Sequence, residues 1–73
     1  MADIKIKSEV TGSVWKIEKQ VGDAIASGDT VMIIESMKME IPVICEDSGT
    51  LSEIHVKEGD AVAEGGVVAT VKG

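Results

Sequence analysis

Short apolar stretches, each bounded by Gly, Asp or Ser, follow one another along the whole chain. Runs of four to eight residues rich in Val, Ile and Thr between such turn residues are typical of β-strands. No window of twelve residues has the apolar spacing of an amphipathic helix. We therefore predict strands at residues 4–7, 12–17, 31–35, 39–45, 49–56 and 67–72, with short bridges near 24–25 and 61–62.

The segment 39–45 alternates cleanly between two faces. One face carries Met39, Ile41, Val43 and Cys45, and the other carries Glu40, Pro42 and Ile44. Proline has no backbone N–H to donate to a neighbouring strand. This strand is therefore expected at a sheet edge, or with Pro42 at a solvent-facing position.

The segment 12–17 departs from strict alternation. Its apolar residues Val14 and Ile17 are three positions apart, which predicts a β-bulge or a strong twist between them. Trp15, the only aromatic residue of the chain, lies within this stretch. Tryptophan is enriched at docking surfaces, but a bulky core residue would also suit this place, so the sequence leaves the role of Trp15 open.

The two halves of the chain resemble each other at a constant offset of 37 residues. Gly12, Gly22 and Gly28 recur as Gly49, Gly59 and Gly65. Gly22 and Gly59 are each followed by Asp, a pair that suits a tight turn because glycine accepts positive φ. Two copies are too few for a solenoid. The repeat predicts an all-β fold, a flattened barrel or sandwich of two quasi-symmetric halves that share one core.

Composition narrows the possible functions. The chain has 73 residues, with 13 acidic and 7 basic residues, no arginine, and a formal net charge of −6. It lacks the basic face and the aromatic platforms that a nucleic-acid partner requires. No apolar run approaches the ~20 residues that span a bilayer, and residues 1–7 do not resemble a signal peptide. We therefore expect a single domain, residues 1–73, in the cytoplasm and without a membrane partner. A chain of this length is also expected to be too small for an independent enzyme, so no catalytic residues are predicted.

Cys45 and His55 are the only cysteine and the only histidine. Such a pair can act as a nucleophile and its base, but Cys45 ends an apolar alternation and His55 lies between Ile54 and Val56. We interpret Cys45 as a small core residue and His55 as a water-facing residue on a strand. One cysteine and one histidine also cannot form the common four-ligand zinc site, so no metal is expected.

The connection between the strands 31–35 and 39–45 is so short that it requires a tight hairpin. Turn tips usually carry Gly, Asn, Asp or Ser, yet this tip has Lys38 between Met37 and Met39. An ordinary solvated lysine would explain the charge but not the two methionines, which gain nothing from exposure to water. We interpret the tip as presenting a primary amine to a partner protein, to which methionines can adapt. Glu35 and Glu40 would add polar recognition at the rim.

Residues 35–40, Glu-Ser-Met-Lys-Met-Glu, resemble the biotin-attachment motif of the biotinyl/lipoyl attachment domain family. The chain is most similar to the stand-alone biotin carboxyl carrier, or biotin/lipoyl attachment, proteins of that family. The resemblance extends from about residue 4 to residue 72 and includes the glycine framework. It implies a barrel-sandwich hybrid of two quasi-symmetric four-stranded halves with a modified lysine on a hairpin tip. Proline positions of many members are occupied here by Ser8-Glu9-Val10 and Cys45-Glu46-Asp47, which affects loops rather than the hairpin.

By this resemblance, a biotin protein ligase joins biotin to the Lys38 amine, and Glu35, Met37, Met39 and Glu40 contribute to recognition. The arm then carries a carboxyl group between a biotin carboxylase and a carboxyltransferase, so the chain is a non-catalytic carrier of a biotin-dependent carboxylase. The alternative is a lipoyl carrier or a dual acceptor of biotin and lipoate. Lipoyl domains usually have Asp-Lys-Ala at the tip, so the two methionines favour biotin. A third hypothesis is an interaction module whose binding survives Lys38→Arg.

Overall fold

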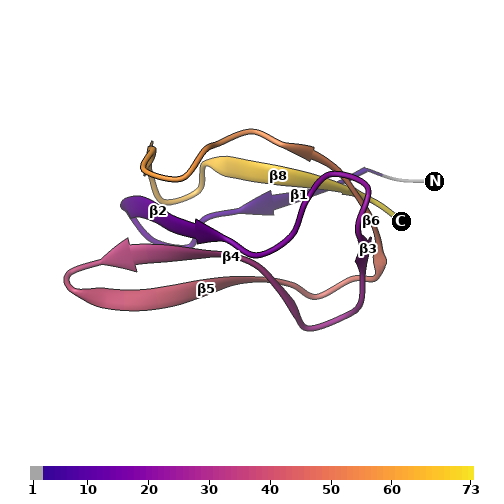
Figure 1. Cartoon of the computed structure of the whole chain (residues 1–73), viewed down its shortest axis with the longest axis horizontal. Helices are drawn as coiled ribbons and strands as arrows, with labels where there is room; N and C mark the ends of the chain where they lie inside the picture. The colour runs from indigo at the N-terminus through magenta and orange to yellow at the C-terminus, as the bar shows by residue number, and fades with distance from the viewer. Residues whose placement is uncertain (1–2) are drawn as a thin grey trace.

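The computed structural model describes residues 3–73, which form eight β-strands and no helix that could cross a bilayer. The strands are β1 (Asp3–Lys7), β2 (Gly12–Ile17), β3 (Ala24–Ile25), β4 (Asp29–Ser36), β5 (Met39–Cys45), β6 (Gly49–Ile54), β7 (Ala61–Val62) and β8 (Val67–Lys72). They form two four-stranded antiparallel sheets, ordered β1-β8-β6-β3 and β5-β4-β2-β7. The molecule measures 35 × 18 × 17 Å, with the β4–β5 hairpin at one end of its long axis and the C-terminus at the other (Figure 1).

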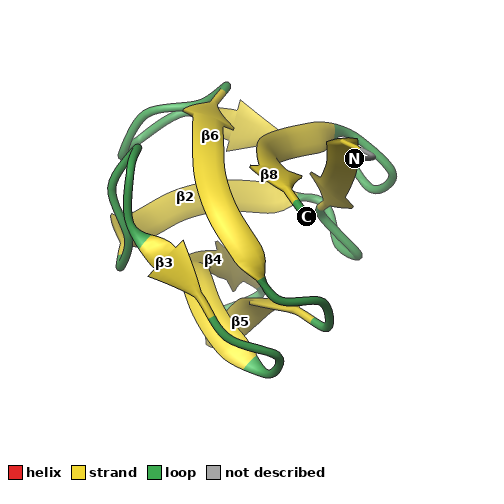
Figure 2. Cartoon of the chain, turned by 90° about the vertical axis from the view of Figure 1, so that its right-hand side faces the viewer, coloured by secondary structure: helices red, strands yellow, loops and turns green. Residues whose placement is uncertain are grey.

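Each sheet contains strands from both halves of the repeat. At the offset of 37 residues, β1, β2, β3 and β4 correspond to β5, β6, β7 and β8. Hydrogen bonds repeat with the same offset, because Gly22 N donates to Leu51 O at 2.8 Å and Gly59 N donates to Val14 O at 2.7 Å. The quasi-symmetric two-sheet architecture predicted from the sequence is confirmed. Its two halves are interwoven, since β1 and β3 pair with β8 and β6 around a common interior (Figure 2).

Inward-facing aliphatic side chains fill the space between the sheets. The largest fully buried ones include Met32 and Ile34 of β4, Val14 of β2 and Leu51 of β6. Burying a side chain of this size contributes roughly 1.5–3 kcal/mol. Because β4 supplies two of these residues, the core holds the stem of the hairpin in place.

The predicted strands agree with the observed ones except at their ends. The strand expected at 49–56 ends at Ile54, where its register with Ala69 of β8 ends, although His55 N still donates to Val68 O at 2.9 Å. The strand expected at 31–35 is longer and covers Asp29–Ser36. The bulge predicted in β2 lies between Val14 and Lys16. Pro42 lies on β5, which is an edge strand as predicted.

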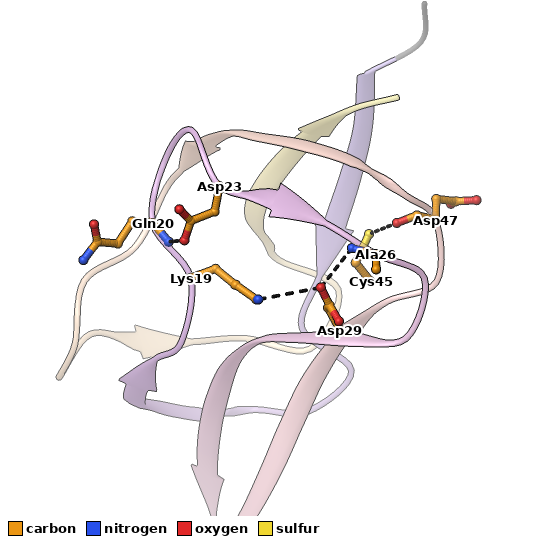
Figure 3. A network of polar contacts seen from close by, with 7 residues as sticks. All are labelled: Lys19, Gln20, Asp23, Ala26, Asp29, Cys45 and Asp47. Carbon is orange, nitrogen blue, oxygen red and sulfur yellow. Dashed lines mark hydrogen bonds and ion pairs between the residues drawn. The ribbon is translucent and has the colours of Figure 1, made fainter.

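Aspartate side chains fix the loops that connect the short strands. Asp23, Asp29 and Asp60 each accept a hydrogen bond of 2.9 Å from the backbone N–H three residues earlier. Lys19 Nζ also lies 3.6 Å from Asp29 Oδ2 (Figure 3). Gly22 has a φ of 98°, as the prediction of a Gly-Asp turn requires. The turn-forming role predicted for Asp23 and Asp60 is confirmed.

Candidate functional site

A two-residue turn at Met37 and Lys38 closes the β4–β5 hairpin. Ser36 pairs with Met39, and the two residues between them have φ values of 51° and 64°. Positive φ at both central residues is typical of a type I′ turn, whose twist matches that of the flanking strands. Met37 and Lys38 are the only non-glycine residues with positive φ among residues 3–73. This backbone costs an L-residue roughly 1–2 kcal/mol, and such strain is concentrated at functional sites.

The tip of the hairpin holds the Lys38 side chain in solvent. Lys38 is exposed, and its neighbours Met37 and Met39 are 92% and 64% exposed. Within residues 3–73, the Lys38 amine forms neither an ion pair nor a hydrogen bond. The predicted geometry, one free amine between two exposed methionines, is therefore present.

The β1–β2 loop and the start of β2 support the base of the hairpin. Ser36 Oγ donates a hydrogen bond to Thr11 O at 2.8 Å. The neighbouring Gly12 lies so close to β4 that a Cβ atom there would overlap the carbonyl oxygen of Glu35. These contacts fix the direction in which the tip projects.

Two carboxylates face each other on the hairpin stem. Glu35 pairs directly with Glu40, and both are exposed. The equivalent pair of the other sheet is Lys72 with Asp3, which has opposite charges. Like charges at directly opposed positions are destabilising. The stem beside Lys38 thus carries negative charge that a basic group on a partner would neutralise.

Cys45 and His55 have separate structural roles. Cys45 is buried, and its Sγ donates to Asp47 O at 3.0 Å. His55 is exposed, and its Nε2 lies 2.9 Å from the hydroxyl of Thr70. Their interpretation as a core residue and a water-facing residue is confirmed, although His55 lies just beyond β6. The part of the chain that the structure describes holds no cluster of three potential metal ligands.

A groove of about 730 Å³ runs along the open side of the sandwich, between the edge strands β1 and β5. Its lining includes Ile6 and Ser8 on one side and Val43 and Cys45 on the other. Lys38 does not line it. The amine is thus presented on a projection, away from this groove.

Replacing Met37 with asparagine is expected to raise stability by about 1 kcal/mol, because asparagine tolerates positive φ better than methionine does. Little packing is lost, since Met37 is 92% exposed. For a domain of this size the melting temperature should rise by about 4–8 °C in thermal unfolding followed by circular dichroism. Met39→Asn is the matched control and should gain nothing, because Met39 lacks positive φ. A lower melting temperature for Met37→Asn would contradict strain in the turn.

The apolar residues that share a sheet with Trp15 were not predicted from the sequence. The structure places this side chain 48% exposed at the bulge of β2, in the same sheet as the hairpin. Ile33 and Pro42 form a direct cross-strand pair in that sheet, and Ile44 is 46% exposed. A comparison of each residue with its equivalent 37 positions away would have identified them as unusually apolar, because the equivalents are all polar.

The fold and the tip together define a class, the small β-domains of two interwoven sheets that present a lysine on a tight hairpin of one sheet. Comparison with known proteins specifies it further. The chain belongs to the biotin/lipoyl attachment family, since the family model described as "Biotin-requiring enzyme" matches residues 4–71. The family predicted from residues 35–40 is thereby confirmed.

Relatives with similar sequences include the biotin/lipoyl attachment protein of Bacillus subtilis, 44% identical over 44 residues, or 60% of either chain. A biotinylated protein TB7.3 homolog of Mycolicibacterium smegmatis is 46% identical over 39 residues, 53% of this chain and 55% of that one. These matches span no more than 60% of the curated relatives.

Two solved structures have the same fold. Kluyveromyces lactis urea carboxylase matches with a TM-score of 0.93 and 40% identity, over 99% of this chain and 6% of that one. A single-chain, multi-domain long-chain acyl-CoA carboxylase matches with a TM-score of 0.86 and 18% identity, over 97% of this chain and 7% of that one. The similarity therefore covers almost all of this chain but a small part of each carboxylase.

Proposed function

We propose that this chain is a biotin carboxyl carrier, with biotin joined covalently to Lys38 and residues 1–73 acting as one attachment domain. The observation that carries the proposal is the exposed Lys38, which forms no ion pair within residues 3–73 and lies on the strained turn between Met37 and Met39. Membership of the family supports it, as does the likeness to part of a urea carboxylase and to a biotinylated protein.

The tip suits the attachment of a cofactor that carries a carboxyl group. A neutral lysine amine attacks an activated carboxyl carbon, the C–N bond of an amide forms, and the bond to the leaving adenylate breaks with its electron pair. The amine proton passes to a base on the ligase, because no titratable group of the tip is bonded to Lys38. Acylation removes the positive charge of the lysine. Biotin, once bound, supplies carboxyl-transfer chemistry that the twenty side chains lack.

The partners that follow from this role are a biotin protein ligase, a biotin carboxylase and a carboxyltransferase. The carrier itself is not a catalyst. Its lysine and the attached arm reach on the order of 15 Å from the backbone. Tethering the reactive group on a docked domain raises its effective concentration at each active site.

Intact-mass measurement of the whole chain tests the proposal. Unmodified protein is incubated with ATP and either a biotin protein ligase with biotin or a lipoate ligase with lipoate. We expect the mass of one biotin to be added in the first reaction and no addition in the second. Modification by lipoate alone would instead identify a lipoyl carrier. No modification in either reaction, with a captured partner that still binds Lys38→Arg, would identify an interaction module.

The two methionines should matter for recognition rather than for folding. The double variant Met37→Asp and Met39→Ala is expected to lower kcat/KM for biotinylation at least ten-fold, because both side chains lie at the exposed tip where the ligase must bind. Val21→Asp is the control, since Val21 is 60% exposed and lies outside the hairpin. Thermal unfolding should show that both proteins stay folded. Biotinylation of the double variant at the parental rate would refute this role.

A further inference from the structure

The outer side of the sheet β5-β4-β2-β7 carries a group of apolar side chains, here called the outer apolar face. It consists of Trp15, Ile33, Pro42 and Ile44. Ile33 is the direct strand partner of both Pro42 and Lys16, which are exposed, so the three residues share the outer side. The bulge between Val14 and Lys16 places Trp15 beside Lys16, on the strand next to that of Ile33, and Trp15 is 48% exposed.

The other sheet offers an internal comparison, because the offset of 37 residues relates equivalent backbone positions. The equivalents of Trp15, Ile33, Pro42 and Ile44 are Ser52, Thr70, Lys5 and Lys7. The register is the same, since Lys5 pairs with Thr70 as Pro42 pairs with Ile33. All four equivalents are polar, so the fold does not require apolar residues at these positions. An exposed apolar group that folding does not require is typical of an interaction site.

The outer apolar face is continuous with the hairpin that presents Lys38. The pair Ile33–Pro42 lies three residues before the pair Ser36–Met39 that closes the turn, a distance of about 10 Å along the strands. The carboxylates of the Glu35–Glu40 pair lie between the two. A protein that encloses the tip therefore meets negative charge first and the apolar face next.

The length of the Lys38 side chain indicates which enzyme contacts the outer apolar face. The unmodified lysine side chain extends only about 6 Å from its Cα atom, so the enzyme that first acylates Lys38 must bring its active site against the hairpin and contact the stem. The modified arm reaches on the order of 15 Å, which lets later enzymes act from farther away. The residues near the stem are thus within the footprint of the acylating enzyme.

We propose that the outer apolar face is a docking surface for the biotin protein ligase, which meets it with an apolar patch bordered by basic side chains. The inference rests on the proposed biotinylation of Lys38. The basic border is complementary to Glu35 and Glu40 and to the net charge of −6. Trp15 is the anchor of this surface, because tryptophan supplies a large contact area in such interfaces.

Steady-state biotinylation of the whole chain tests this surface. In the double variant Trp15→Ser and Ile44→Ser, we expect KM for the carrier to rise at least ten-fold while kcat at saturation stays within two-fold. The matched control is Val21→Ser, which removes an apolar side chain that is 60% exposed and lies outside the face. Its KM should equal that of the wild type, and melting temperatures should show that all three proteins are folded.

A second measurement on the wild type does not depend on the folding of a variant. Hydrogen exchange is compared for the free chain and for the chain bound to ligase that holds an unreactive analogue of biotinyl adenylate. We expect protection to extend along β2, β4 and β5 and to be absent from β6 and β8. Protection confined to residues 36–39 would overturn the proposal.

The kinetic outcomes also separate this proposal from the proposed function. If the wild type gains no biotin, the proposed function itself fails. If the wild type is biotinylated but the double variant has an unchanged KM, only the docking surface is wrong. An equal rise in KM for Val21→Ser, or slower carboxyl transfer with unchanged biotinylation, would also overturn the assignment of this face to the ligase.

Discussion

Replacing Lys38 with arginine is expected to abolish biotinylation. Arginine keeps the positive charge and the length of the side chain, but the guanidinium group stays protonated and does not act as an acyl acceptor. The change should leave stability within about 0.5 kcal/mol, because Lys38 is exposed and makes no ion pair within the described chain. Intact mass after incubation with ligase, biotin and ATP should show one added biotin for the wild type and none for Lys38→Arg.

A second lysine provides the control for this experiment. Lys57 is exposed in the loop after β6, and Lys57→Arg should accept biotin as the wild type does. An added biotin on Lys38→Arg would mean that a different lysine is the acceptor, and the proposed attachment site would then be wrong.

Gly12→Ala is expected to destabilise the fold by about 2–3 kcal/mol, the upper part of the range of roughly 1–3 kcal/mol typical of an extra carbon in a packed position. The new Cβ atom would overlap the carbonyl oxygen of Glu35 and lie 3.1 Å from Cγ2 of Ile34. Strand β2 would then have to move away from β4, against the pairing of Ser13 with Glu35. The melting temperature in thermal unfolding should fall by roughly 10–20 °C.

Two other glycines make this test specific. A Cβ atom at Gly22 meets nothing within 4 Å, so Gly22→Ala should lose only about 1 kcal/mol from its positive φ. Gly49 is the symmetry equivalent of Gly12, and a Cβ atom there would overlap Lys72 O. Gly49→Ala should therefore lose as much stability as Gly12→Ala without disturbing the hairpin stem. A loss for Gly12→Ala no larger than that for Gly22→Ala would contradict this account.

Much of the fold could be predicted because short segments of the sequence indicate which strands form and which of their faces are buried. The alternation that ends at Cys45 fixed which side of β5 is buried, and Pro42 marked the strand as an edge. The irregular spacing of Val14 and Ile17 indicated the bulge. The tip could be predicted for a different reason. Met37 and Met39 flank a turn where they are exposed and contribute no burial to folding, which indicates a role in binding.

Other features depend on long-range pairing and could not be predicted from local patterns. The pairing of β1 with β8 brings opposite ends of the chain together, so the interwoven sheets follow from no single segment. The predicted end of β6 is wrong because the apolar alternation continues through Val56, whereas the register of β6 with β8 ends at Ile54 and Ala69. The outer apolar face could not be predicted because Trp15 and Pro42 are far apart in sequence. Their strands come into one sheet only because each pairs with β4.

The interwoven sheets have a consequence for synthesis and quality control. Residues 1–37 cannot complete either sheet alone. One sheet also needs β6 and β8, and the other needs β5 and β7, all of which are synthesised later. Non-local pairing of this kind slows folding, because distant segments must be brought together before their contacts form. The sheet that carries the Lys38 hairpin therefore becomes complete only after β7 has been synthesised. A ligase that requires the complete sheet would label finished molecules and pass over nascent or damaged ones.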